Sequence, residues 1–116
     1  MTLTLDALKT AVDVFTAERD WTQFHTPKNL SMALSVEASE LVEIFQWLTP
    51  EQSTDLSDEQ LSNVTDELAD VLIYLVQISN RLDIDLLDSS FAKLKKNKMK
   101  YPVEKSRGKA LKYSDL

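Results

Sequence analysis

The sequence lacks cysteine altogether and contains one glycine, one histidine and three prolines among 116 residues. Without cysteine there can be no disulfide, thiol nucleophile, iron–sulfur cluster or cysteine-bound zinc. A single glycine, Gly108, excludes every glycine-rich phosphate loop, and a single histidine, His25, excludes a multi-histidine metal site. Because helix breakers are few and 43% of the residues are hydrophobic, we expect one all-α domain covering residues 1–116.

Export and membrane signals are missing as well. Asp6 interrupts the N-terminus before an apolar signal-peptide core could form. The longest uninterrupted apolar run covers residues 71–76, whereas a membrane span needs roughly 20 residues. The sequence therefore predicts a cytoplasmic protein without a membrane partner.

The net charge of −6 conceals a strong asymmetry along the chain. Residues 93–116 contain nine basic and two acidic side chains, whereas residues 1–92 contain four basic and seventeen acidic ones. The basic C-terminal tail, from about residue 101, could pack on an acidic body or close over an anionic substrate. Nucleic-acid binding is a third interpretation, but an acidic body repels a polyphosphate, and we expect no nucleic-acid partner.

Hydrophobic periodicity predicts four helices, over about residues 5–19, 29–48, 57–82 and 86–100. Thr4 is the expected N-cap of the first helix, and Ser57 with Gln60 forms a capping-box pattern for the third. Pro27 keeps the preceding residue out of a helix, and Pro50 ends the second helix. The C-terminal tail shows no clear hydrophobic period.

The third predicted helix is apolar on nearly every side between residues 71 and 78. One small four-helix chain can hardly cover such a helix, so we predict a bundle that assembles as a dimer or tetramer. The residues expected in the subunit interface are Val71, Leu72, Ile73, Leu75, Val76 and Ile78.

Acidic side chains interrupt the apolar faces of two helices. On a helical projection of residues 29–48, Glu37 lies about 20° from the centre of the apolar stripe and Glu40 about 80° away at its edge. Glu67 and Asp70 repeat this spacing on the third helix, where Tyr74 continues the same strip. If the two helices pack together, four carboxylates converge.

Local cations cannot neutralise these carboxylates, because no lysine or arginine occurs in residues 29–80. Four converging carboxylates instead indicate a hard divalent ion, Mg²⁺ with Mn²⁺ as a substitute. The Glu-x-x-His motif of di-iron bundles is absent. The alternatives are solvated helix charges, pairing with the lysine-rich fourth helix, or a structural metal in a non-catalytic oligomerisation module.

Several motifs in order resemble the MazG-like nucleoside triphosphate pyrophosphohydrolases, and most closely their dCTP pyrophosphatase branch. The resemblance extends from about residue 19 to residue 113 and rests on these segments: Glu37-x-x-Glu40, Glu67-x-x-Asp70, Trp21-x-x-Phe-His25-x-Pro, Phe45-Gln-Trp47, Asp70-Val-Leu-Ile-Tyr74, Asn97-x-x-Lys-Tyr-Pro102 and Lys112-Tyr113.

This resemblance implies an all-α fold of associating subunits and a Mg²⁺ site formed by the four acids. It also implies cleavage of a (deoxy)nucleoside triphosphate to monophosphate and pyrophosphate, in house-cleaning of the nucleotide pool. We expect a dCTP-like substrate, with dATP or a modified base as rivals. Glu40, at the edge of its stripe, is our candidate for the general base.

The remaining candidates would bind the nucleotide. Trp47 lies on the same side of its helix as Glu40 and could stack on a base, although an ordinary core role is the alternative for the aromatic residues. Without a glycine-rich loop, phosphate binding depends on metal and on basic side chains, for which the candidates are Lys93, Lys96, Lys98, Lys100 and Lys112. The positions that residues occupy in the family's motifs add the remaining substrate-binding candidates and favour Lys93 among the lysines. The predicted substrate-binding set is Trp21, His25, Trp47, Tyr74, Lys93, Asn97, Tyr101 and Lys112.

Overall fold

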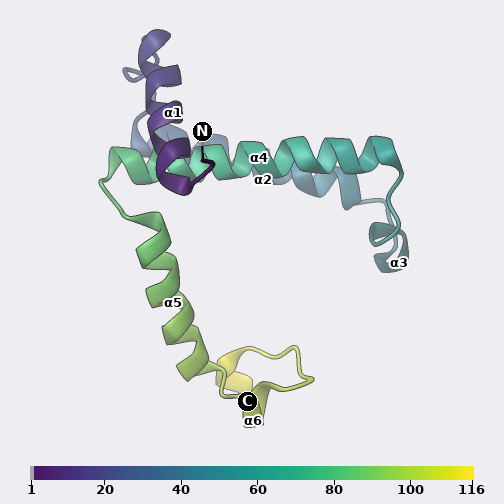
Figure 1. The fold of residues 1–116 in the computed structure, drawn as a ribbon. Helices are drawn as coiled ribbons and strands as arrows, with labels where there is room; N and C mark the ends of the chain where they lie inside the picture. Colours follow the sequence, from purple (N-terminus) through teal and green to yellow (C-terminus); the bar gives the residue numbers. More distant parts are fainter. Residues whose placement is uncertain (1) are drawn as a thin grey trace. The chain divides into compact units, whose positions relative to one another are not determined.

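The computed structural model describes residues 2–116, and throughout this range the chain forms helices and no β-strand (Figure 1). The predicted all-α fold class is therefore confirmed. The helices are α1 (Leu5–Glu18), α2 (Pro27–Phe45), α3 (Pro50–Ser53), α4 (Asp58–Arg81), α5 (Leu86–Lys100) and α6 (Val103–Ser106), followed by a 3₁₀ turn, η1 (Tyr113–Asp115). They form two compact units, one extending to Asp83 and the other comprising Ile84–Leu116.

Capping side chains start the first and fourth helices where the sequence predicts. The Thr4 hydroxyl accepts a hydrogen bond from the Ala7 amide at 3.1 Å. At α4, the Ser57 hydroxyl accepts from the Gln60 amide at 3.1 Å, and the Gln60 side chain accepts from the Ser57 amide at 2.9 Å. These bonds satisfy backbone donors that have no partner within the helix, and they fix both starts.

The bounds of α2 differ from the prediction at both ends. Thr26 is extended and caps the helix, which begins at Pro27 rather than near Asn29 because proline is well suited to the first helical position. The helix ends at Phe45, earlier than the predicted residue 48. The connector that follows is also not wholly irregular, since Thr49 opens the single-turn α3 with its own capping box.

The first unit has a core in which α4 packs against both α2 and α1. Figure 1 shows α2 and α4 side by side, and they run antiparallel, since Leu30 and Gln77 line one cavity while Glu37 and Asp70 share one carboxylate cluster. Leu30 and Val76 are the most buried large side chains, at 1% and 0% exposure. The amide of Asn80 ties α1 to α4 by donating to the Asp13 carboxylate at 2.9 Å.

Among the described residues of the first unit, one face of α4 is exposed. Leu61, Leu68, Leu72 and Leu75 follow a heptad-like spacing and are all exposed. Val76, which the sequence placed in a subunit interface, is instead buried inside the chain. No helix within residues 2–116 is both long enough and apolar enough to cross a membrane.

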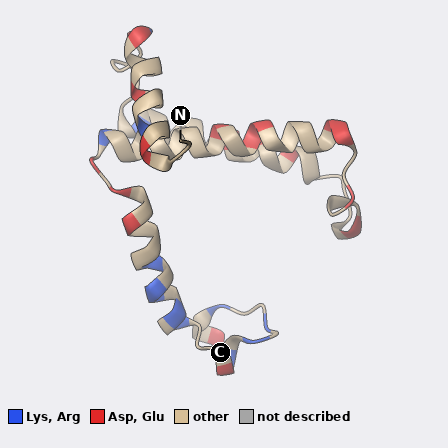
Figure 2. Ribbon diagram, in the orientation of Figure 1, with Lys and Arg blue, Asp and Glu red and all other residues tan. Residues whose placement is uncertain are grey.

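The second unit is built on α5, which Asp85 caps by accepting from the Asp88 amide at 2.9 Å. Its basic residues gather towards the C-terminal end of α5 and in the tail (Figure 2). The tail is ordered by aromatic contacts, with the Tyr101 and Tyr113 rings edge to face at 6.1 Å and the Lys100 ammonium 5.0 Å from the Tyr113 ring centre. The short α6 and η1 lie where the sequence showed no period.

The burial of Leu30 yields a test of the α2–α4 packing. Leu30→Ala should lower the free energy of unfolding by about 2–5 kcal/mol, because it removes buried methyl groups and leaves a cavity. Met32→Ala on the same helix is the control, since that side chain is 57% exposed and should cost much less. Denaturant unfolding measures both variants, and equal losses would contradict this arrangement of the core.

Candidate metal and substrate site

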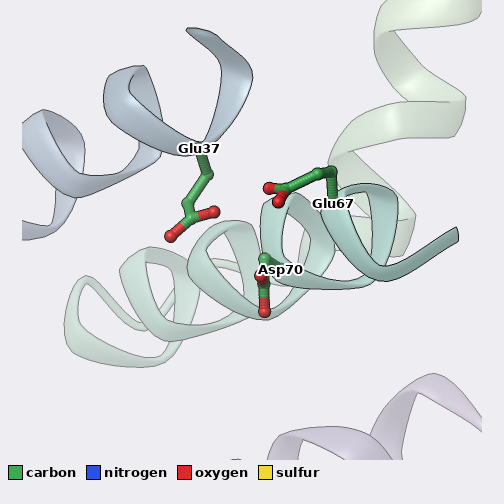
Figure 3. A group of neighbouring side chains, drawn as sticks. All are labelled: Glu37, Glu67 and Asp70. Carbon is green, nitrogen blue, oxygen red and sulfur yellow. The ribbon is translucent and has the colours of Figure 1, made fainter. Parts of the chain in front are cut away.

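Three carboxylates converge between α2 and α4 (Figure 3). Glu37 comes from α2, while Glu67 and Asp70 lie one turn apart on α4, and one oxygen from each lies within 4.8 Å of the others. All three side chains are half-buried. The packing of two amphipathic helices thus brings together acids from two separate segments, as their position near the apolar stripes predicts.

No cation or hydrogen-bond donor within residues 2–116 compensates these acids. Oε2 of Glu37 and Oε2 of Glu67 are buried without a hydrogen-bond partner in this range. Within residues 2–116 an ion pair forms away from this site, where a guanidinium nitrogen of Arg19 lies 3.7 Å from a carboxylate oxygen of Glu18. Figure 2 shows acidic positions in red along the α4 ribbon, and no lysine or arginine of this helix precedes Arg81 at its C-terminal end. Buried carboxylate oxygens without partners carry a large desolvation cost.

The pKa values of the site reflect this cost. Burial, followed by the neighbouring carboxyls of Glu40, Glu67 and Asp70, raises the pKa of Glu37 from 4.5 to about 7. Burial also raises the pKa of Glu67; the carboxyls of Glu40 and Asp70 add to this effect, and the neighbouring carboxyl of Glu37 opposes it. The pKa of Tyr74 is raised by burial and by the negative charges of Glu37, Asp70 and Glu40.

This donor set fits a divalent metal ion. The site offers only carboxylate oxygens, which hard divalent cations prefer, and two of these oxygens are buried and lack a partner. A bound cation would neutralise the repulsion that raises the pKa of Glu37. Solvated helix charges, the simplest alternative, do not account for oxygens that are shielded from water.

The two other acids of α2 differ in position. Glu40 is half-buried one turn after Glu37, close enough to raise the pKa of both Glu37 and Glu67, although it is not among the three residues whose oxygens cluster. Glu43 is exposed, as its place on the helical projection predicts.

The aromatic candidates lie in the first unit at different exposures. Trp21 packs edge to face on Phe15, with ring centres 5.7 Å apart, and lies tilted against His25 at 6.1 Å. Trp47 follows the end of α2 and is 87% exposed, so the core alternative does not apply to it within the single chain. Tyr74 is half-buried one turn after Asp70.

The basic and polar candidates belong to the second unit. Lys93 and Asn97 lie one turn apart on α5 and line a shallow depression with Ser89, Ser90 and Leu94. Tyr101 is the C-cap of α5, and Lys112 directly precedes η1. The predicted set is therefore divided between the two units, with the carboxylates in one and the proposed phosphate ligands in the other.

Comparisons with known proteins show the family of this chain. A family model described as "MazG-like family" matches residues 32–116, which include all four acids. The chain belongs to the MazG-like family. The dCTP pyrophosphatase 1 of Bos taurus is 43% identical over 115 residues, and that of Homo sapiens 39%; each match covers 97% of this chain and 68% of the relative. The family resemblance inferred from the motifs is confirmed.

A solved structure supports the fold of this MazG-like chain. The crystal structure of a pyrophosphatase from Archaeoglobus fulgidus superimposes with a TM-score of 0.81 at 34% sequence identity. The match covers 88% of this chain and 95% of that one. The all-helical architecture is thus that of a known pyrophosphatase.

Sequence reasoning missed one group of polar residues that the fold brings together. Thr16, Gln77, Asn80 and Arg81 line a cavity in the first unit together with the predicted His25. Gln77 lies in a run of apolar residues on α4, and the one available signal was its seven-residue separation from Asp70, which puts both on one helix face.

The raised pKa of Glu37 predicts how the stability of the metal-free protein depends on pH. The folded-state pKa of about 7 exceeds the unfolded value of 4.5, so the folded state binds the proton more tightly. The stabilisation is full below pH 4.5 and is lost as the pH rises through about 7. Glu37→Gln should therefore raise the melting temperature in EDTA at about pH 8 and change it little at about pH 5.

Glu43→Gln is the matched control for this measurement, because Glu43 is exposed on the same helix. Thermal unfolding at both pH values compares the variants with the unmodified chain. A melting temperature that responds equally to the two substitutions would show that carboxylate repulsion in the cluster does not limit stability.

Proposed function

We propose that this chain hydrolyses nucleoside triphosphates to monophosphate and pyrophosphate with Mg²⁺, taking a dCTP-like deoxynucleotide in cytoplasmic house-cleaning of the nucleotide pool. The observation that carries the proposal is the convergence of Glu37, Glu67 and Asp70 without a compensating cation in residues 2–116. Membership of the MazG-like family and relatives named dCTP pyrophosphatase 1 support this chemistry. A non-catalytic module with a structural metal is the alternative.

Each acid has a part in this proposal. Glu37, Glu67 and Asp70, together with Glu40, would hold Mg²⁺ or Mn²⁺, which when bound neutralises the phosphates and acidifies water. A water oxygen bonds to the α-phosphorus while the bond to the bridging oxygen breaks, and pyrophosphate leaves with that electron pair. Glu40 accepts the proton of the attacking water as general base.

The remaining candidates orient the substrate. Trp21, His25, Trp47 and Tyr74 would contact the nucleoside, since exposed aromatic faces stack on bases. The phosphate oxygens need donors that carry no negative charge, and the basic second unit supplies these. The residues assigned to the phosphates are Lys93, Asn97, Tyr101 and Lys112.

The four acids should behave as one unit in catalysis. Glu37→Gln, Glu40→Gln, Glu67→Gln and Asp70→Asn keep the shape of each side chain but remove its charge, so the fold should survive. We expect each to lower kcat/KM by about 100-fold or more, because an incomplete ligand set binds the ion poorly. Pyrophosphate release measured against nucleotide concentration, at several Mg²⁺ concentrations, gives kcat/KM and its dependence on the ion.

Two further results test the same site. Glu43→Gln should keep near-normal activity, and chromatography should find monophosphate and pyrophosphate without diphosphate. Hydrolysis that persists in EDTA, or that depends on Glu43 as much as on Glu37, would overturn the proposed chemistry. A folded chain that binds Mg²⁺ but hydrolyses none of the common nucleoside triphosphates would favour the non-catalytic module.

We also propose that the chain self-associates as a dimer or tetramer through α4. The exposed leucines at positions 61, 68, 72 and 75 form one apolar face that follows a heptad-like spacing. A contiguous apolar surface of this kind is uncommon on a monomer and is typical of an interface.

Leu68→Glu should reduce the assembly to smaller species, because it buries an unpaired charge in the proposed interface. Since Leu68 is 53% exposed in the single chain, the helix itself should persist. Ser62→Glu adds the same charge at an exposed position off the leucine face and serves as the control. Light scattering that finds an active 13.2 kDa monomer of the unmodified chain would exclude this assembly.

A further inference from the structure

A cavity of about 350 Å³ lies in the first unit, and most of its lining has no part in the proposed chemistry. It is bounded by α1, by the loop that follows it, by the start of α2 and by the C-terminal half of α4. Its polar lining includes Asp13, Thr16, Thr22, His25, Gln77 and Asn80.

Gln77 is the most unusual residue of this lining. It is only 8% exposed, and its side-chain amide makes a single long hydrogen bond, from Nε2 to the Thr16 hydroxyl at 3.5 Å. Its carbonyl oxygen Oε1 is buried and has no hydrogen-bond partner among residues 2–116. A buried acceptor without a donor destabilises the fold, so this carbonyl is suited to a donor that a ligand brings.

A second unpaired atom belongs to another residue of the same cavity lining, and an aromatic ring lies beside that residue. Nδ1 of His25, which also lines the cavity, is buried without a partner in the described range. The Trp21 ring lies 6.1 Å from the His25 ring and is 42% exposed, leaving part of its surface free for stacking. By contrast, Asn80 has its amide engaged by Asp13.

The cavity also lies at a defined position relative to the carboxylates. Gln77 follows Asp70 by seven residues on α4, and Leu30 precedes Glu37 by seven on the antiparallel α2. Seven residues are two turns, or about 10 Å along the helix axes on the same face. That separation is comparable to the span between the α-phosphate and the far edge of the base in an extended nucleotide.

We propose that this cavity binds the edge of a nucleobase that carries an exocyclic amino group, with Gln77 Oε1 accepting a hydrogen bond from that group. The inference rests on the proposed function, which puts the α-phosphate at the carboxylate cluster. An amino-bearing base such as cytosine supplies the missing donor, whereas uracil would present a carbonyl oxygen to the same acceptor. Because the Thr16 hydroxyl holds Nε2, the carbonyl is the free end of the Gln77 amide, and Gln77 is then the residue that selects between the two bases.

Binding of product analogues tests Gln77 independently of hydrolysis. Calorimetry should show that the unmodified chain binds dCMP about 10- to 100-fold more tightly than dUMP. The 2-pyrimidinone deoxynucleoside monophosphate, which lacks only the amino group, should lose a similar factor. Gln77→Leu should abolish the preference by weakening dCMP binding alone, since this variant cannot accept the hydrogen bond.

Two further variants separate this role from a structural one. Gln23→Leu changes the same residue type in the neighbouring loop, outside the cavity lining, and should keep the preference for dCMP. Gln77→Met provides a second apolar replacement of similar length if Gln77→Leu does not fold, and the 2-pyrimidinone comparison requires no substitution. Far-ultraviolet circular dichroism verifies the fold of each variant.

The outcomes distinguish this inference from the proposed function. Equal binding of dCMP, dUMP and the 2-pyrimidinone analogue by the unmodified chain would overturn it, as would a Gln77 variant that folds and still prefers dCMP. If the chain hydrolyses no triphosphate but shows a Gln77-dependent preference for dCMP, the base site is supported and the pyrophosphohydrolase activity fails. Hydrolysis of dCTP without that preference would support the activity and overturn the base site.

Discussion

Repulsion among carboxylates that are held between two packed helices is the constraint on which this structure depends. Leu30 and Val76 contribute to the core where α1, α2 and α4 meet, and the same α2–α4 packing forces Glu37 against Glu67 and Asp70. The cost appears in the pKa of Glu37, which burial and its acidic neighbours raise to about 7. The metal-free protein therefore stores unfavourable electrostatic energy, which binding of a divalent cation would relieve.

The charge distribution along the chain also favours binding of a cation at the carboxylates. Residues 29–80 contain no lysine or arginine, which leaves the carboxylates free for a cation, while nine of the thirteen basic residues follow position 92. An anionic triphosphate needs both a cation at the carboxylates and basic side chains along its phosphates. In the proposed function, Lys93 and its neighbours are the basic side chains assigned to the phosphates.

Local patterns in the sequence predicted much of the fold because they are caused by local physics. The Thr4 and Ser57 caps depend on contacts three residues away, and their helices begin where predicted. The short helix at Pro50–Ser53 was missed, although its Thr49–Gln52 capping box follows the same rule, because one turn shows no hydrophobic period. The apolar residues between positions 71 and 78 of α4 predicted an interface. Only the packing of α1 and α2 decides that Val76 is internal and Leu72 exposed.

The candidate site was predictable to a similar extent. Glu37 and Asp70 could be identified because a carboxylate near an apolar stripe has few explanations other than a buried partner. Gln77 could not, since a single glutamine on a mainly apolar helix is unremarkable until the fold shows its carbonyl buried and unpaired beside His25. Sequence periodicity gives the face of a helix, but the neighbours of that face come from the tertiary structure.

Proton release on binding of Mg²⁺ tests whether the mutually repelling carboxylates are the site of the cation. Calorimetric titration in buffers of different ionisation enthalpy, at about pH 6 and about pH 9, measures the number of protons released per ion bound. Because the pKa of Glu37 is about 7, its carboxyl is mostly protonated at the lower pH. Release of about one proton per ion is expected near pH 6 and almost none near pH 9, and Glu37→Gln should strongly reduce the release. Mg²⁺ binding without proton release near pH 6, or no binding at either pH, would contradict it.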